Sequence, residues 1–278
     1  MKLGFHGATT MTSSLETDVE ITSRAGFKGL EVWAAKMDTY LATHTVDDLR
    51  YLFERNAVVP LAFNSIEFIG FRGKEYPQVQ MRCRELSKLA KYIGCPTIAV
   101  VPSPTPDRNI PWSEIVNEYV TVLRDLGAIA AEYNIRLAFE FLGFGWCSVR
   151  TPRSAWEIVQ KTNLGNVGMI IDTAHYYAGG ALLKELEQLD GNSIFAFHIN
   201  DLEDTPREAI TDGTRLFPGY GVVPLKKICA IMRAIGYDGH CSIEIFRPEY
   251  WQRDPQSVAD EAKKTALQLL TPYFTLEQ

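Results

Sequence analysis

The 278-residue chain is poor in cysteine, and none of its cysteines stands in a C-x-x-C pair. An odd number of widely spaced cysteines argues against a disulfide framework and against a thiolate zinc site. The pattern instead predicts reduced, buried thiols and a cytoplasmic location. The five residues are Cys83, Cys95, Cys147, Cys229 and Cys241.

Basic charge and long apolar runs are also scarce. The chain has 28 Lys and Arg against 34 Asp and Glu, for a net charge of -6. Nucleic-acid binding requires clustered basic residues that neutralise phosphates, so no nucleic-acid partner is expected. No apolar run approaches the roughly 18 residues of a membrane span. The first residues, MKLGFHGATT, lack the basic and apolar regions of a signal peptide, so neither export nor a membrane partner is expected.

What the chain does contain is an alternation of short apolar runs with longer amphipathic segments. Helical patterns cover residues 45–56, 111–134 and 257–274, and Thr45 and the pair Thr151–Pro152 are typical of helix starts. The least regular helical pattern follows the sixth predicted strand. Residues 201–222 form the longest predicted loop, and we expect it to close over bound substrate. The apolar runs predict strands at residues 2–6, 29–33, 59–64, 97–102, 135–141, 167–172, 194–199 and 241–246.

Eight apolar strands, each followed by a helix-like segment, are the pattern of an α/β fold with a single (β/α)8 TIM barrel over residues 1–278. A doubly wound open sheet is the alternative, and the chain lacks the Gly-rich phosphate loop that such sheets commonly carry. In a (β/α)8 barrel the carboxyl ends of the strands form one rim, where the active site lies. Polar residues at predicted strand ends are therefore the candidates for function.

The last four predicted strands carry such residues at or near their ends. They are Glu140, Asp172, His198 and Glu244, and the carboxylates are flanked by apolar residues. Burying three unpaired carboxylates side by side would be strongly unfavourable. A divalent cation offsets that cost, because three carboxylates and one imidazole suit Mn²⁺ or Mg²⁺ and also accept Co²⁺ or Zn²⁺. We therefore expect one divalent metal ion, with Mn²⁺ as the first choice.

With these residues the sequence resembles the xylose isomerase-like barrel family of sugar isomerases and epimerases, over essentially the whole chain. The segments 211–221 (TDGTRLFPGYG) and 246–251 (FRPEYW) are similar to the inosose (2-keto-myo-inositol) isomerases within it. The resemblance implies a metal held by Glu140, Asp172, His198 and Glu244, with His175 beside the substrate. It rests on residues 7–10, 61–64, 137–143, 172–175, 197–204, 217–221 and 243–251.

The reaction that the resemblance implies moves a ketone between adjacent carbons of a cyclic polyol or sugar, by proton transfer through an enediolate. Glu140 or Glu244 would take the proton and return it, and His175 would move the hydroxyl protons. Ketose 3-epimerases, hydroxypyruvate isomerases, inosose dehydratases and 3-dehydroshikimate dehydratases share the metal site and stay open as alternatives. The ketose 3-epimerases place an arginine six residues after the ligand histidine, where this chain has Asp204.

Other residues near the predicted strand ends are candidates for substrate contacts. An amide can donate a hydrogen bond to a hydroxyl group, and an indole ring can pack on the apolar face of a sugar ring. The candidates are His6, Trp33, Asn64, Trp146, Asp201 and Arg247. For Arg247, an ion pair with Asp201 or Glu249 is the favoured alternative.

Three other functions fit the sequence less well. A phosphorylated substrate would need a basic cluster or a Gly-rich helix start at the rim, and the chain has neither there. The abasic-site endonucleases of the superfamily need a three-metal site with several more histidines than the five present. A sugar-binding module without catalysis would be expected to lack a metal ligand, whereas all four are here. A small-molecule substrate is thus the expected partner. A homo-oligomer is a separate prediction, because Tyr250 and Trp251 are aromatic residues expected at the surface.

Overall fold

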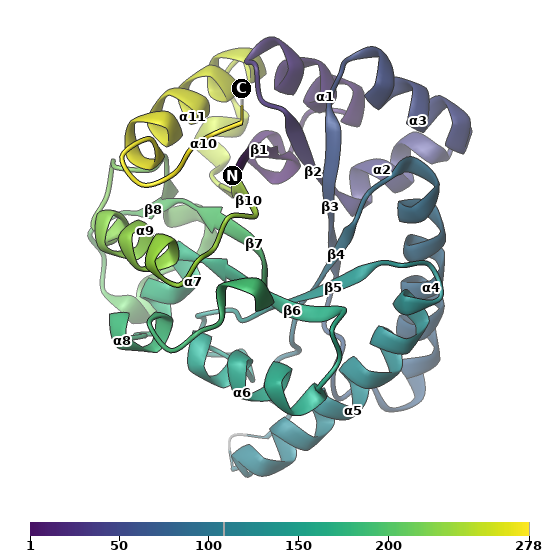
Figure 1. Cartoon of the computed structure of the whole chain (residues 1–278), viewed down its shortest axis with the longest axis vertical. Helices are drawn as coiled ribbons and strands as arrows, with labels where there is room; N and C mark the ends of the chain where they lie inside the picture. Colours follow the sequence, from purple (N-terminus) through teal and green to yellow (C-terminus); the bar gives the residue numbers. More distant parts are fainter. Residues whose placement is uncertain (108, 278) are drawn as a thin grey trace.

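Eight parallel strands close into a barrel in the computed structural model, which describes residues 1–107 and 109–277 (Figure 1). Their order around the barrel is β1-β10-β7-β6-β5-β4-β3-β2. This closed parallel sheet confirms the predicted (β/α)8 architecture. The strands are β1 (Lys2–His6), β2 (Gly29–Trp33), β3 (Val59–Ile66), β4 (Thr97–Val100), β5 (Arg136–Glu140), β6 (Val167–Asp172), β7 (Ile194–Ile199) and β10 (His240–Ile243).

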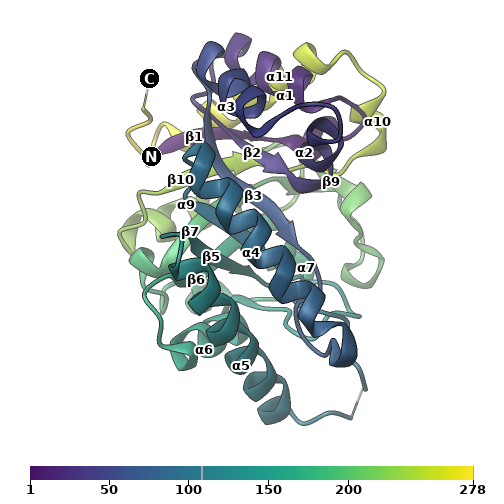
Figure 2. The same cartoon turned by 90° about the vertical axis from the view of Figure 1, so that its right-hand side faces the viewer.

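Helices surround the barrel on its outer face (Figures 1 and 2). Three of them, α7, α8 and α10, are no longer than two turns. The helices are α1 (Leu15–Arg24), α2 (Ala34–Leu41), α3 (Val46–Arg55), α4 (Tyr76–Ile93), α5 (Trp112–Ala131), α6 (Pro152–Thr162), α7 (Thr173–Ala178), α8 (Leu183–Leu186), α9 (Leu225–Ala234), α10 (Pro248–Trp251) and α11 (Pro255–Leu270).

Two predicted helix starts are confirmed by their capping contacts. Thr45 Oγ1 accepts a hydrogen bond from the backbone N–H of Asp48, whose carboxylate accepts one from the N–H of Thr45. Thr151 caps α6 in the same way, with a proline in the first helical position. The irregular pattern after β6 has a physical cause, because Gly180 adopts a φ of 72° and separates α7 from the single turn of α8.

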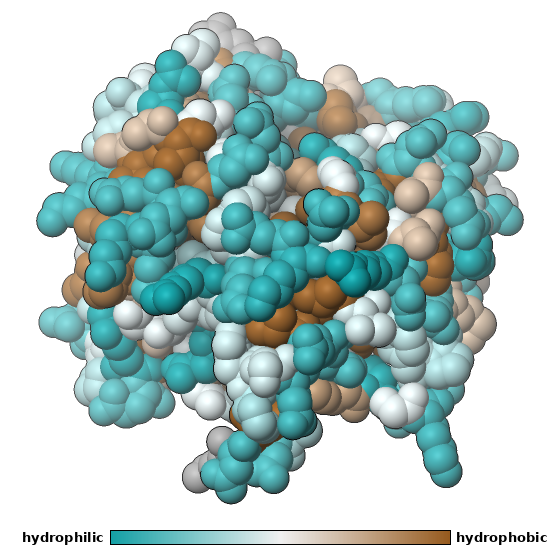
Figure 3. Space-filling view, turned by 60° about the horizontal axis from the view of Figure 1, so that its bottom comes forward, coloured by the Kyte–Doolittle hydropathy of each residue, from teal (hydrophilic) through white to brown (hydrophobic). Residues whose placement is uncertain are grey.

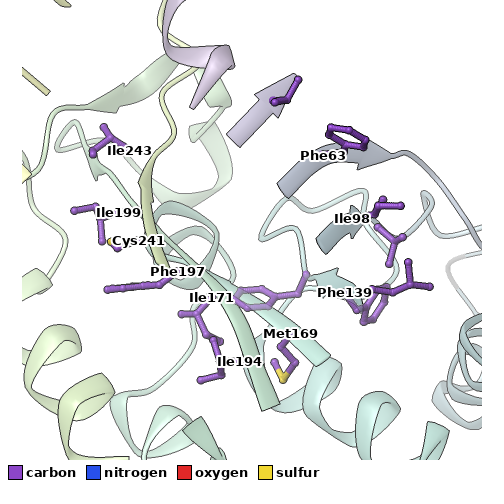
Figure 4. Packing of buried hydrophobic residues seen from close by; sticks show 14 of the residues in the cluster. Phe63, Ile98, Phe139, Met169, Ile171, Ile194, Phe197, Ile199, Cys241 and Ile243 are labelled. Atoms are coloured by element: carbon purple, nitrogen blue, oxygen red, sulfur yellow. The ribbon is translucent and has the colours of Figure 1, made fainter. Parts of the chain in front are cut away.

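Apolar side chains fill the layer between the sheet and the helices. Figure 4 shows such residues from β3, β4, β5, β6, β7 and β10 distributed around the barrel wall. Alternate residues on each strand point the other way, into the barrel interior. The polar strand ends predicted from the sequence lie on this inner side.

The inside of the barrel is filled beneath those polar ends. Leu61 occupies the space beside Gly4 and Gly29, where any side chain would collide with it. Phe195 belongs to a separate buried cluster with Ala99, Ala138, Ile170 and Ala196, and Arg136 lies over its ring, 4.7 Å from the centroid. Ala138 is two residues before Glu140 on β5, so the two side chains face the same side. Leu61 and Phe195 thus fill the barrel interior beneath the rim residues.

The long segment after β7 is more ordered than the predicted loop. It contains the strands β8 (Asp201–Leu202) and β9 (Arg215–Leu216), which pair in an antiparallel hairpin. Arg215 and Phe217 are buried. Figure 2 shows β9 and α10 on the side of the molecule away from the two chain termini.

The burial of individual residues and the length of the helices test three of the predictions. All five cysteines are free and buried, as expected. No helix in the described ranges is long and apolar enough to cross a membrane, and hydrophilic residues predominate on the face in Figure 3. The two aromatics predicted to be exposed are half-buried: Tyr250 stacks on Phe217, and Trp251 Nε1 donates to the carbonyl of Ala8.

Candidate active site

Four strands deliver the predicted metal-binding side chains to one point at the rim. Glu140, Asp172 and His198 lie at or next to the ends of β5, β6 and β7, and Glu244 directly follows β10. One ligand atom from each lies within 4.8 Å of those of the other three. His198 Nδ1 is 3.1 Å from Glu140 Oε1 and 3.1 Å from Glu244 Oε2. All four side chains are buried.

The electrostatics of this group fit a divalent cation. Burial raises the pKa of Glu140, and Glu244 and Asp172 raise it further against the opposing effect of His198. Burial also acts to raise the pKa of Glu244, but His198, His6 and Arg215 outweigh it and hold the pKa below its usual range. Three carboxylates crowded around one imidazole are an oxygen-rich donor set that such a cation stabilises.

Arg215 is a site residue that the sequence analysis missed. Its Nη1 donates to Asp172 Oδ2 at 2.9 Å and to Glu244 Oε2 at 3.0 Å, and its Nη2 contacts His175 Nε2 at 3.0 Å. A guanidinium only donates, so Nε2 of His175 accepts and the proton of the neutral ring is on Nδ1. Burial lowers the pKa of His175 and favours this neutral form. Arg215 belongs to a predicted loop, where no strand pattern marked its position.

Glu31 on β2 was also missed, although the sequence carried a signal for it. It stands between Leu30 and Val32, the same apolar setting that marked the other carboxylates. Both of its carboxylate oxygens lie 3.1 Å from His198 Nε2. Glu31 therefore touches the ligand group from the side opposite to Glu140 and Glu244.

A cavity of about 200 Å³ opens above the ligand group. Trp33 and Phe246 meet edge to face, with ring centroids 5.5 Å apart. Trp146 stacks on Phe144, with centroids 5.7 Å apart, and meets Phe68 edge to face. All five rings line the cavity. The mouth therefore has aromatic walls, while its floor carries the carboxylates and His175.

Three of the six predicted substrate contacts line this cavity, as does the predicted catalytic His175, and three do not. Trp33, Asn64, Trp146 and His175 are among the lining residues. His6 is fully buried behind the ligand layer, with Nε2 3.2 Å from Glu244 Oε1 and Nδ1 accepting from the N–H of Ala8. The structure thus places His6 against Glu244 rather than among the lining residues, so its contact is to a metal-binding candidate.

Asp201 and Arg247 are also corrected. The carboxylate of Asp201 accepts hydrogen bonds from the backbone N–H groups of Leu202, Gly219 and Val223, and so secures its own loop. Arg247 forms ion pairs with Glu203 at 2.7 Å and Glu249 at 3.3 Å. Neither residue is among those lining the cavity. The favoured ion-pair interpretation of Arg247 is confirmed for Glu249, and Glu203 takes the place of Asp201.

Comparison with known proteins agrees with this geometry. A protein named inosose isomerase from Halalkalibacterium halodurans is 35% identical over 280 residues, covering 100% of this chain and 99% of the relative. An inosose isomerase from Bacillus subtilis is 34% identical, covering 99% of this chain and 100% of the relative. A crystal structure of the IolI protein with a bound zinc atom superposes with a TM-score of 0.96 at 34% identity, covering 99% of this chain and 100% of that one.

The family model described as Xylose isomerase-like TIM barrel matches residues 19–268. That range includes all four metal-binding candidates together with Glu31, His175 and Arg215. Since the match takes in most of the barrel and the whole ligand group, the chain belongs to the xylose isomerase-like TIM barrel family.

Proposed function

We propose that this protein is a divalent-metal-dependent isomerase that moves a ketone between adjacent carbons of a cyclic polyol of the 2-keto-myo-inositol class. The observation that supports this most is the buried group of three carboxylates and one imidazole at the floor of an aromatic-walled cavity. The full-length relatives named inosose isomerase support the substrate class.

Glu140, Asp172, His198 and Glu244 would hold the metal ion. The bound ion supplies Lewis acidity, which draws electron density from a substrate carbonyl and makes the neighbouring C–H more acidic. We propose Mn²⁺ as the working ion, with Zn²⁺, the ion in the IolI crystal structure, as the competing choice. Elemental analysis of the purified protein and activity with Mn²⁺, Mg²⁺, Co²⁺ and Zn²⁺ distinguish these ions.

Side chains of the protein transfer the protons that move between substrate atoms during the reaction. Glu140 or Glu244 takes the proton from the carbon next to the ketone and returns it to the former carbonyl carbon. His175, held by Arg215 with its proton on Nδ1, serves the hydroxyl groups that exchange protons at the same time. Asn64 lines the cavity, and its Nδ2 donates to Glu31 and Glu244 at 3.4 Å, which leaves its amide oxygen as the acceptor for a substrate hydroxyl.

The two large indoles at the mouth support a ring-shaped substrate. Trp33 lies on one wall with Phe246, and Trp146 lies on another with Phe144. Flat aromatic faces match the C–H face of a cyclic polyol. We therefore propose that the ring of the substrate packs against one or both indoles, as predicted from the sequence.

The charges around the cavity disfavour an anionic substrate such as 3-dehydroshikimate. Glu67 and Asp212 line the cavity in addition to Glu140 and Glu244. Among the described residues that line the cavity, Arg215 is the single Lys or Arg, and it is already paired with carboxylates. A keto-polyol without charge avoids this repulsion. Epimerisation of a ketose uses the same pair of glutamates and is the alternative that the test below addresses.

Product analysis by NMR tests the proposal. Keto-inositols, ketohexoses, hydroxypyruvate and 3-dehydroshikimate are each incubated with the protein and Mn²⁺, and His198→Ala serves as the control without the imidazole ligand. We expect interconversion of keto-inositol regioisomers. A 3-epimer as the main product would establish an epimerase instead, and loss of water would establish a dehydratase.

Two further features belong to the proposal. The free thiols support a cytoplasmic location. A homo-oligomeric state stays a prediction, which analytical ultracentrifugation tests.

A further inference from the structure

Both ring nitrogens of His198 face carboxylates, on opposite sides of the ring. Nδ1 points to the ligand group, 3.1 Å from Glu140 Oε1 and 3.1 Å from Glu244 Oε2. Nε2 lies 3.1 Å from each carboxylate oxygen of Glu31. His198 and Glu31 are both 0% exposed, so these contacts are made away from solvent.

The contact between Glu31 and His198 crosses the barrel interior. Glu31 is on β2 and His198 on β7, and β1 and β10 lie between these strands in the sheet. Both side chains come from regular strands, which hold their backbones more rigidly than loops do. The imidazole ring of His198 thus contacts the other metal-binding candidates on one side and Glu31 of β2 on the other.

Glu31 is surrounded by three imidazole groups and one amide. In the described ranges, ring nitrogens of His198, His240 and His6 lie 3.1, 3.7 and 3.9 Å from its carboxylate, and Asn64 Nδ2 donates to it at 3.4 Å. The nearest of these, His198, is the one that belongs to the proposed metal site. A buried carboxylate without such a partner would be strongly unfavourable.

A histidine that binds a metal through one nitrogen carries its proton on the other. A carboxylate that accepts this proton in a hydrogen bond decides which nitrogen stays free, and it makes the ring a stronger ligand. For His198 the nitrogen left free in this way is Nδ1, the atom that faces Glu140, Asp172 and Glu244.

We propose that Glu31 is a positioning residue, which holds the Nε2–H of His198 and so presents Nδ1 to the metal. The inference rests on the proposed metal site and is independent of the identity of the substrate. Loss of Glu31 removes the acceptor of the Nε2–H and with it one of the contacts that fix the orientation of the ring. Metal affinity then falls by ~10- to 100-fold, the usual effect of removing such a partner.

Zinc affinity measured without substrate is the first test. Chelator competition gives the affinity of the unsubstituted protein and of Glu31→Gln and Glu31→Ala. We expect a loss of about 10-fold for Gln, which keeps an uncharged acceptor, and up to about 100-fold for Ala.

Two control variants separate positioning from general damage. Asp18→Asn removes another buried carboxylate, which pairs with Lys36 outside the ligand group. Glu132→Gln removes an exposed one, which pairs with Arg84. We expect both to keep the zinc affinity of the unsubstituted protein, even though Asp18→Asn lowers the melting temperature.

The second test determines which nitrogen of the His198 ring binds zinc and which carries the proton. Nitrogen NMR of ¹⁵N-histidine protein loaded with Zn²⁺ has only five imidazoles to resolve. We expect His198 to show zinc on Nδ1 and a slowly exchanging proton on Nε2, and Glu31→Gln to speed that exchange. Since this measurement uses the unsubstituted protein, it decides the matter even where Glu31→Ala fails to fold.

The possible failures are distinguishable. Zinc on Nε2, or folded Glu31 variants with unchanged affinity and unchanged proton exchange, overturns the positioning role alone. An unsubstituted protein that binds no zinc and no Mn²⁺ overturns the proposed metal site and the positioning role together.

Discussion

Arg215 joins His175 to the ligand group, with Nη2 3.0 Å from His175 Nε2 and Nη1 2.9 Å from Asp172 Oδ2. One guanidinium therefore sets the protonated nitrogen of the predicted proton carrier and touches a predicted metal ligand. His175 Nδ1 has no hydrogen-bond partner among the described residues. The ring thus has a proton to donate at Nδ1 while its basic nitrogen is occupied, so we expect His175 to act as a donor in the proton transfer.

Removal of the metal should abolish activity and lower the melting temperature. Without the ion, Glu140, Asp172 and Glu244 remain buried together with only partial compensation from Arg215 and His198. Adding back one equivalent of Mn²⁺ or Co²⁺ should restore both properties, because the ion binds the folded state. Calorimetry and elemental analysis measure this. Full activity in protein shown to be free of metal would contradict it.

Replacing either glutamate with glutamine should separate proton transfer from metal binding. Glu140→Gln and Glu244→Gln keep the size and one oxygen of the side chain but remove the base. We expect both variants to fold, and at least one to retain metal while losing activity on the order of 100-fold or more. Circular dichroism, metal content and kcat give the readouts. Glu132→Gln, on the surface, is the matched control and should behave like the unsubstituted protein.

Isotope exchange gives an independent view of the same step. In D₂O the unsubstituted protein should place deuterium on the carbon next to the ketone, because a carboxylate base exchanges with water between taking and returning the proton. A hydride shift would leave that carbon unlabelled. If no label enters over many turnovers and both glutamine variants stay fully active, Glu140 and Glu244 are ligands only.

Within the predicted loop 201–222, the contacts below leave residues 203–214 as the segment that we expect to close over the substrate. Asp212 lines the cavity and pairs with Arg215, whereas Asp201 already holds the backbone at Gly219 and Val223. A substrate analogue should therefore slow hydrogen exchange in 203–214 and leave 215–223 nearly unchanged. Exchange that is the same with and without saturating analogue would show that the segment is not a lid.

Asp201→Ala should lower stability rather than remove a substrate contact. Three backbone N–H groups lose their shared acceptor, and we expect a loss of about 1–3 kcal/mol in the free energy of unfolding. Asp201→Asn keeps one acceptor oxygen and should lose less. Urea denaturation measures both. A raised KM at unchanged stability would restore Asp201 as a substrate contact.

The thiols should be unreactive in the folded protein. Burial raises the pKa of Cys83 and Cys147 to about 11 and that of Cys95 to about 12, so little thiolate forms at mildly alkaline pH. A chromogenic thiol reagent should react only as the chain unfolds, and denatured protein should release five equivalents. Rapid reaction of even one equivalent with native protein would contradict this.

Strand positions were predictable because they depend on local apolar runs. The expected strands at 2–6, 29–33, 167–172 and 194–199 coincide with β1, β2, β6 and β7. Once the strands form a barrel, residues at their carboxyl ends must meet at one rim. This reasoning brought together the four metal-binding candidates, of which three lie within strands and Glu244 directly follows one.

Residues whose placement depends on a loop or on the depth of the barrel were not predictable in this way. Asp201 stands two residues after the end of β7, but the chain turns there and directs its carboxylate to its own loop. Arg215 reaches Asp172 from 43 positions away along the chain. His6 has the pattern of a rim residue, yet it packs behind Glu244. These outcomes follow from contacts between distant segments, which local periodicity does not contain.

The filling of the barrel interior by Leu61 and Phe195 has a consequence for turnover. With the barrel filled from below, a substrate enters and its product leaves by the same aromatic mouth. A bound product blocks the next substrate. Substrate and product, both ketones, therefore compete for one binding site in the forward and in the reverse reaction. The rate should therefore fall early in a progress curve, with product inhibition that is competitive with substrate. Net conversion will depend on how quickly another reaction consumes the released product.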